Sequence, residues 1–235
     1  MLIICGSSVS VMESDVLGYQ SPLYGRRSGQ WKMNPLSFQY LHEFLPWDIT
    51  DQVRAYAALG GILAYLHKFN PTLNFWKNIS ENILEKGTFL YSEAEILLNY
   101  EFREPANYMV LLRAIASGKV SIGEICNCTG MDKGMVSKYL HLGNLHIIRD
   151  ELPVTSHPGA RGKQYRIIDP YLLFWFRYVY PNRIDLEFSR VDEVQQAIMR
   201  SYDHHCGQCF ENLVQEFIRE KVILPDTSWE RLGRW

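Results

Sequence analysis

The sequence predicts a mainly helical chain with a small β component (α+β), and three stretches favour this class. Residues 34–104 carry helix-periodic apolar residues separated by turn signals. Residues 105–169 combine a helix-turn-helix pattern with two short β-like runs, and residues 170–235 begin with a dense aromatic run followed by helical patterns. The chain has 235 residues, of which 47% are hydrophobic, so it can form one or two domains with cores of their own.

The first stretch, residues 1–33, contains a continuous apolar run at residues 2–5 that ends in Gly6, Ser7 and Ser8. This pattern predicts a central parallel strand whose polar carboxyl end faces a ligand. No segment up to about residue 100 offers it a parallel partner, so we expect the rest of that sheet to lie in an N-terminal part outside this sequence. Residues 1–30 should then be loosely held.

The second stretch, residues 34–104, reads as an all-helical region. Proline, asparagine and glycine punctuate it, and the predicted helices lie near residues 35–44, 50–69, 73–86 and 92–102. Gly60 and Gly61 stand inside the second of these helices, where each costs about 1 kcal/mol. They therefore predict a kink or a close approach of two backbones.

Residues 121–169 carry the signals of a complete winged helix-turn-helix. Ser121 and Glu124 have the spacing of a capping box, Thr129 and Gly130 suit a tight turn, and Asp132 can cap a second helix. Apolar residues of the second helix can point inward (Val136, Leu140 and then Leu145), which leaves an outward face of polar and basic residues (Lys133, Ser137 and His141, with Gly134 and Lys138 beside them).

Two β-like runs, residues 147–154 and 163–168, follow the second helix, and the Gly- and Arg-containing loop 155–162 joins them as a wing. Residues 105–170 hold eight Lys and Arg against five Asp and Glu, in a chain whose formal net charge is −2. We therefore predict phosphate contacts from Lys133, Lys138, Arg161 and Lys163, with Ser137 and His141 on the same DNA-binding face. No Arg stands on the outward face of the second helix, so little sequence preference is expected. The alternative is a winged helix used for domain packing or for protein contact, the latter through exposed residues such as Tyr139.

The last stretch, residues 170–235, begins with aromatic residues that predict a buried helix packed against the winged helix: Tyr171, Phe174, Trp175, Phe176, Tyr178 and Tyr180. Stacking on nucleic-acid bases is the alternative use of this run. Two further helices are predicted at residues 191–202 and 209–222, the second with an inward apolar face (Phe210, Leu213, Val214, Phe217 and Ile218). A metal-like group of four residues lies between them (His204, His205, Cys206 and Cys209). It lacks the second spaced pair of structural zinc sites, so no metal is predicted.

Four segments occur in the same order as in a known family: LIICGSS, SPLYGRR at residues 21–27, residues 60–66, and DPYLLFWFRYVYPNR at residues 169–183. The chain resembles the C-terminal part of the archaeal ATPases, P-loop proteins of the AAA/STAND type that use ATP and Mg²⁺ and carry a winged helix and a restriction-endonuclease-like domain. The resemblance implies four parts: remnant of the ATPase core (1–33), helical lid (34–104), winged helix (105–169) and the N-terminal part of a restriction-endonuclease-like domain (170–235). It also places Ser7, Ser8, Arg26 and Arg27 near the nucleotide, and it matches Glu211 to a glutamate that assists a nuclease metal site.

The sequence departs from this family at the sites of chemistry. It contains no G-x-x-x-x-G-K-[ST] motif, no apolar strand ending in Asp-Glu, and no nuclease Asp or Glu-x-Lys. We therefore predict no catalytic residue, no cofactor of its own, and no ATP binding, ATP hydrolysis or DNA cleavage by this chain.

Five cysteines, no secretory leader and no long apolar run favour a cytoplasmic protein without a membrane segment. Two functions remain. The first is a winged-helix module that binds duplex DNA weakly and largely without sequence preference. The second is a protein-interaction module that docks a separately encoded ATPase half.

Overall fold

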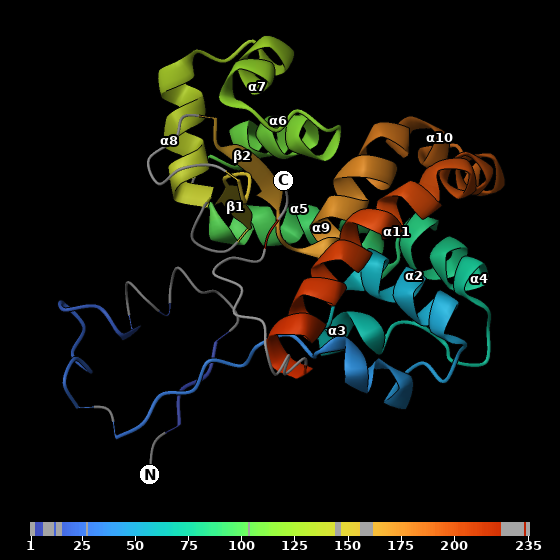
Figure 1. Ribbon diagram of the computed structural model, residues 1–235, viewed down its shortest axis with the longest axis horizontal. Helices are drawn as coiled ribbons and strands as arrows, with labels where there is room; N and C mark the ends of the chain where they lie inside the picture. The colour runs from blue at the N-terminus through green and yellow to red at the C-terminus, as the bar shows by residue number, and fades with distance from the viewer. Residues whose placement is uncertain are drawn as a thin grey trace.

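The computed structural model of the protein describes residues 3–6, 12, 16–26, 28–102, 104–143, 147–155, 162–221 and 233. These residues are mainly helical and contain a two-stranded antiparallel sheet, so the predicted α+β class is confirmed at this level. In Figure 1, α6, α7, α8 and the hairpin gather on one side, while α2, α4, α10 and α11 gather on the other. Helix α9 lies between the two groups.

Residues 34–104 fold into short helices, as the turn signals predicted. Asp48 and Asn74 begin two of them by accepting hydrogen bonds from the backbone amides of Asp51 and Lys77. The elements are the 3-10 helix η2 (Phe38–Glu43), α2 (Ile49–Leu59), α3 (Leu63–Leu66), α4 (Phe75–Ile79), the π-helix η3 (Ser80–Leu84) and α5 (Phe89–Glu101).

The Gly60–Gly61 pair divides the helix predicted at residues 50–69. Gly60 ends α2 with φ 63°, a conformation that glycine adopts without steric penalty. The Gly61 carbonyl accepts a hydrogen bond from the Leu36 amide at 2.7 Å, and a Cβ at Gly61 would lie 2.0 Å from the Leu36 carbonyl oxygen. The predicted close backbone approach is confirmed, whereas the prediction of one continuous helix is wrong.

The third stretch contains α6 (Pro105–Ala116), α7 (Ile122–Thr129), α8 (Lys133–Gly143), β1 (Ile148–Glu151) and β2 (Gln164–Ile167). The strands pair antiparallel, with Ile148 opposite Ile167, and both isoleucines are buried. The capping box of Ser121 and Glu124 is confirmed, since each side chain bonds the backbone amide of the other residue. Most of the predicted wing, residues 156–161, lies outside the described residues, as does Leu145.

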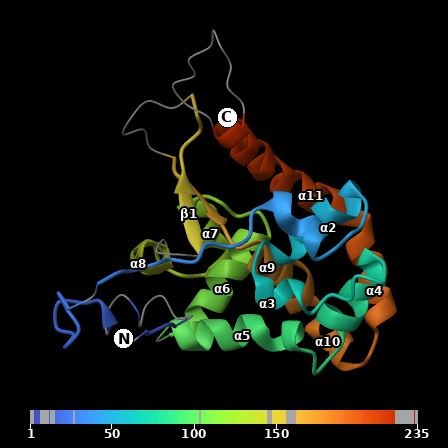
Figure 2. The same ribbon diagram turned by 90° about the horizontal axis from the view of Figure 1, so that it is seen from below.

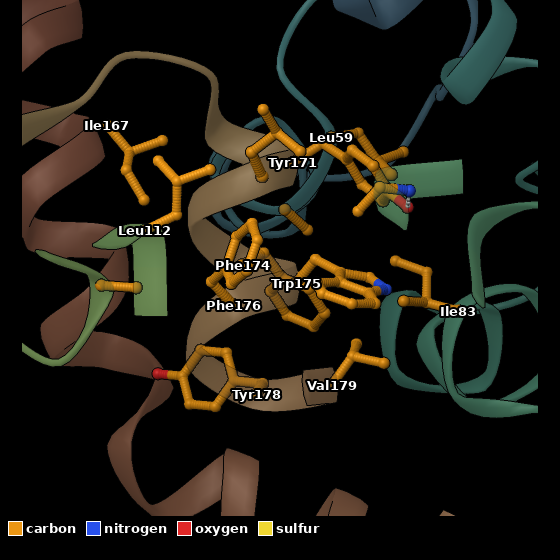
Figure 3. Close-up of a cluster of buried hydrophobic side chains, with 14 of the residues drawn as sticks. Leu59, Ile83, Leu112, Ile167, Tyr171, Phe174, Trp175, Phe176, Tyr178 and Val179 are labelled. Atoms are coloured by element: carbon orange, nitrogen blue, oxygen red, sulfur yellow. Dashed lines mark hydrogen bonds between the residues drawn. The ribbon is translucent and has the colours of Figure 1, made fainter. Parts of the chain in front are cut away.

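The aromatic run forms α9 (Pro170–Phe174), the π-helix η4 (Trp175–Val179) and the 3-10 helix η5 (Tyr180–Asn182), followed by α10 (Arg183–Glu187). Its side chains lie between Leu112 and Ile167 on one side and Leu59 and Ile83 on the other (Figure 3). The rings of Tyr171, Phe174, Trp175 and Phe176 are no more than 1% exposed, so the predicted core role is confirmed. One buried cluster runs from Leu41 to Tyr202 and crosses the boundaries expected at residues 104 and 169.

Helix α11 (Val191–Lys221) is one helix of 31 residues, so the prediction of two helices is wrong. The expected break lies where α11 packs on α2. There the Tyr202 hydroxyl donates to the Arg54 carbonyl at 2.8 Å, and His205 Nε2 lies 2.9 Å from the Ala57 carbonyl. These contacts tie α11 to α2 at the segment where the break was predicted.

The C-terminal half of α11 carries the apolar face that was predicted to point inward. Phe210, Val214 and Phe217 are 52%, 37% and 58% exposed, so this prediction is wrong for three of its five residues. Leu213 and Ile218 are half-buried. All three side chains therefore leave a large part of their apolar surface open to solvent.

The strand predicted at residues 2–5 is absent from its described part, residues 3–5, and this prediction is wrong there. Ile3 and Ile4 are 74% and 45% exposed. The reason is the missing partner, because the only sheet among the described residues is the β1–β2 hairpin. The N-terminal segment, drawn blue, runs outside the helical body in Figures 1 and 2.

The contact at Gly61 generates a test of stability. We expect Gly61→Ala to lower the free energy of unfolding by about 2 kcal/mol or more, because the added methyl group overlaps the Leu36 backbone. Gly207→Ala is the matched control. Its Cβ would meet no atom, and alanine favours a helix interior by about 1 kcal/mol, so this variant should gain stability. Equal urea midpoints for Gly61→Ala and the parent would contradict the packing described.

His205 generates a test of pH dependence. Burial, with a smaller contribution from the nearby charge of Arg177, lowers the pKa of His205 to about 4. Since the pKa of an unfolded histidine is about 6.5, the unfolded chain binds more protons between these values, and stability falls as pH falls from 6.5 toward 4. This group should lower the free energy of unfolding by about 2 kcal/mol between pH 7 and pH 5.

Urea unfolding at pH 7 and pH 5 measures this loss. In His205→Gln, which keeps an N–H donor for the Ala57 carbonyl, most of the loss should disappear. His204→Gln changes the exposed neighbouring side chain and should show the same loss of stability as the parent protein. If His205→Gln lost as much stability between pH 7 and pH 5 as the parent protein, the pH dependence would not come from His205.

Candidate nucleic-acid interface

The helix-turn-helix segment brings α7 and α8 together through a tight turn. Gly130 ends α7 in the left-handed region with φ 72°, and Thr129 Oγ1 accepts a hydrogen bond from the Met131 amide at 3.2 Å. Asp132 Oδ1 accepts from the Met135 amide at 2.9 Å and so caps the start of α8, as predicted.

Helix α8 presents the two faces that its sequence predicted. Val136 and Leu140 are 0% and 2% exposed and pack into the core. The outward residues are all exposed: Lys133, Gly134, Ser137, Lys138 and His141.

Tyr139 does not belong to this face. It is 3% exposed and its hydroxyl bonds Glu104 and Asn107, so its prediction as an exposed contact residue is wrong.

The cations of this face differ in their partners. Lys138 Nζ lies 3.6 Å from Glu104 Oε2 and 5.2 Å from the centroid of the Tyr139 ring. Hydrogen bonding from Tyr139, and then the charge of Lys138, lower the pKa of the Glu104 carboxyl, so Glu104 stays ionised beside Lys138. Lys133 makes no ion pair with any described residue. The face therefore carries one lysine held by a carboxylate and one that is available to phosphate.

The hairpin places Lys163 beside a carboxylate as well. Its Nζ lies 2.6 Å from Asp150 Oδ2, and the hydrogen bond to Asp150 raises the pKa of Lys163. Arg161, the other predicted wing contact, lies outside the described residues. A phosphate that binds Lys163 must compete with Asp150.

The basic residues of the module do not all face one surface. Of the eight Lys and Arg in residues 105–170, Arg113, Arg149 and Arg166 line a cavity beside the hairpin together with Arg177 of η4. Sequence reasoning missed this group because its members come from α6, both strands and η4. The period-2 pattern of β1 was the one available signal, since it places Arg149 and Glu151 on the same face of the strand.

Of the four residues that the family resemblance places near a nucleotide, the structure describes one, Arg26. Ser7, Ser8 and Arg27 lie outside the described residues. Arg26 is exposed at the end of a turn, where its amide donates to the Leu23 carbonyl at 3.1 Å.

The C-terminal candidates are spread along α11. Glu211 is exposed, and the described residues contain no group of three or more His, Cys, Asp or Glu side chains that could hold a metal ion. His204 is exposed and His205 is buried against α2. Burial raises the pKa of Cys206 to about 11 and that of Cys209 to about 12, which disfavours the thiolate that metal binding needs.

Hydropathy gives one negative finding. Among the helices of the described residues, none is both long enough and apolar enough to cross a membrane.

The chain is similar to an archaeal protein over its whole length. The whole chain is 37% identical over 238 aligned residues to an uncharacterized protein of Methanocaldococcus jannaschii, and it spans about half (53%) of the length of that relative. No solved structure matches the chain. Residues 175–235, which include η4 and α11, match a domain family, DUF234, described as archaea bacterial proteins of unknown function.

Proposed function

We propose that this chain is the C-terminal portion of an archaeal-type ATPase and that its residues 105–169 form a winged helix that binds duplex DNA. The observation that carries the proposal is helix α8, which follows a tight turn and presents Lys133, Ser137, Lys138 and His141 on one exposed face beside an antiparallel hairpin. A second helix with exposed polar and basic residues is the element that enters the major groove in helix-turn-helix proteins.

The partners of these lysines set the strength of the proposed interaction. Lys138 and Lys163 each contact a carboxylate, so binding phosphate exchanges one ionic contact for another. The described part of the outward face carries no arginine for bidentate contacts to guanine. Weak binding to all sequences is therefore expected, without catalysis by this chain, which lacks the P-loop motif and the acidic strand.

Salt-dependent DNA binding tests the proposal. Fluorescence anisotropy with a labelled duplex should give dissociation constants on the order of 10⁻⁴ to 10⁻⁶ M at physiological salt. Lys133→Ala should weaken binding to every sequence and lower the salt slope by about one unit. Lys77→Ala, which removes a lysine of α4 paired with Glu81, is the control and should change neither quantity. A flat signal for the parent at low salt would end the DNA proposal.

Glu104 offers a gain-of-function test. Glu104→Gln keeps an acceptor for the Tyr139 hydroxyl but removes the charge beside Lys138, so DNA affinity should rise about two- to fivefold, the size of an exposed ion pair. Glu81→Gln removes a carboxylate paired with Lys77 and should leave affinity unchanged. If DNA affinity fell or stayed constant in Glu104→Gln, Lys138 would not be a phosphate contact.

A second candidate function, docking of a separately encoded ATPase half, is favoured by the uncovered apolar residues of α11. Phe210, Val214 and Phe217 recur at helical spacing and are all exposed. Under this function, Phe217→Ser should weaken binding of that ATPase half, the affinity should depend little on salt, and Lys133→Ala should have no effect.

A further inference from the structure

A cavity of about 460 Å³ lies between the β1–β2 hairpin and the helices α6, η4 and α11. Residues of β1 and of the C-terminal half of α11 contribute to its wall, and Figure 2 shows the course of these two elements. Its wall combines basic side chains with apolar ones, including Ile168, Leu173 and Phe176. The volume falls within the range of roughly 300–1,000 Å³ that is usual for small-molecule sites.

The charge of the wall is strongly positive. Four of its described residues are arginines (Arg113, Arg149, Arg166 and Arg177), and Glu151 is the one acidic residue among them. The same chain has a formal net charge of −2. Positive charge is therefore concentrated at this cavity.

Three of these arginines lack a carboxylate partner among the described residues. Arg113 lies 5.7 Å from the centroid of the Tyr180 ring, and Arg177 Nη1 lies 3.5 Å from Gln208 Oε1. Arg149 makes no ion pair with a described residue either. Other arginines of the fold do find carboxylates, since Arg54 pairs with Asp51, Arg183 with Glu95 and Arg190 with Asp185.

The hairpin fixes two of the cavity arginines close together. Arg149 and Arg166 are directly opposite each other in the antiparallel register, so both side chains leave the same face of the sheet. Like charges at such a pair destabilise a sheet. Glu151 Oε2, 3.5 Å from Arg166 Nε, offsets part of this repulsion, and an anion in the cavity would offset more.

We propose that this cavity binds a small molecule that bears a phosphate group. Arginine guanidinium groups match the geometry of phosphate oxygens and form two hydrogen bonds at once. Arg113, Arg149 and Arg177 hold the phosphate, and the apolar wall at Ile168, Leu173 and Phe176 contacts the remainder of the ligand. This site is separate from the outward face of α8.

Isothermal titration calorimetry with inorganic phosphate, pyrophosphate and ribose 5-phosphate tests the site, with sodium chloride of equal ionic strength as the reference. Tighter binding of ribose 5-phosphate than of inorganic phosphate identifies an organic phosphate, and the reverse order identifies the free anion. Arg113→Gln and Arg177→Gln should each weaken binding at least tenfold, the effect of losing one charge-assisted hydrogen bond. Arg190→Gln, outside the cavity, is the matched control and should bind like the parent.

Thermal unfolding of each variant shows whether it is folded. If Arg113→Gln or Arg177→Gln does not fold, Arg149→Gln is used in its place, because Arg149 is at an exposed strand position. Lack of binding at millimolar concentrations of all three probes would overturn the proposal, as would equal losses in Arg190→Gln and Arg177→Gln. Displacement of the probe by duplex DNA would assign the cavity to DNA phosphates instead. Lys133→Ala should keep probe binding, so the phosphate site and the DNA-binding proposal can fail independently.

Discussion

The burial of the aromatic segment at residues 170–179 is the constraint on which the rest of the structure depends. Polar atoms in this segment are buried, and each would cost about 1–3 kcal/mol if left without a partner. The Tyr171 hydroxyl donates to the Leu90 carbonyl and accepts from the Ala94 amide, and Trp175 Nε1 donates to the Tyr91 carbonyl at 2.8 Å. All three bonds reach one turn of α5. They fix α5 against α9 and η4, while Leu112 and Ile167 close the opposite side of the aromatic layer (Figure 3).

The same core determines the course of α11. Tyr202 and His205 are three residues apart, and so are Arg54 and Ala57, whose carbonyl groups bind them. Two helices can satisfy both pairs only if each is continuous over that interval. This packing places Gln208 and Asn212 across from the hairpin and so forms one wall of the cationic cavity.

Local signals in the sequence predicted local structure well. The Ser121–Glu124 box, the turn at Gly130 and the buried face of α8 follow from residues within about ten positions of each other, and the structure bears them out. Pairing between distant segments was harder to foresee. A break was predicted at residues 203–208 because the alignment of His205 with the Ala57 carbonyl, 148 residues earlier, has no sequence signal. The strand predicted at residues 2–5 failed for a different reason, because a strand forms only with a partner and the described residues supply none.

Charge compensation separates the two basic surfaces of the protein. On β1, alternate residues face opposite sides, so Asp150 reaches Lys163 while Arg149 faces the cavity. Glu104 holds Lys138 on α8, which leaves Lys133 as the lysine of that face without an ion pair among the described residues. More uncompensated positive charge therefore lines the cavity than the described outer face of α8. A count of basic residues along residues 105–170 cannot distinguish these two surfaces. Only the folded structure shows that Glu104 and Asp150 pair with Lys138 and Lys163.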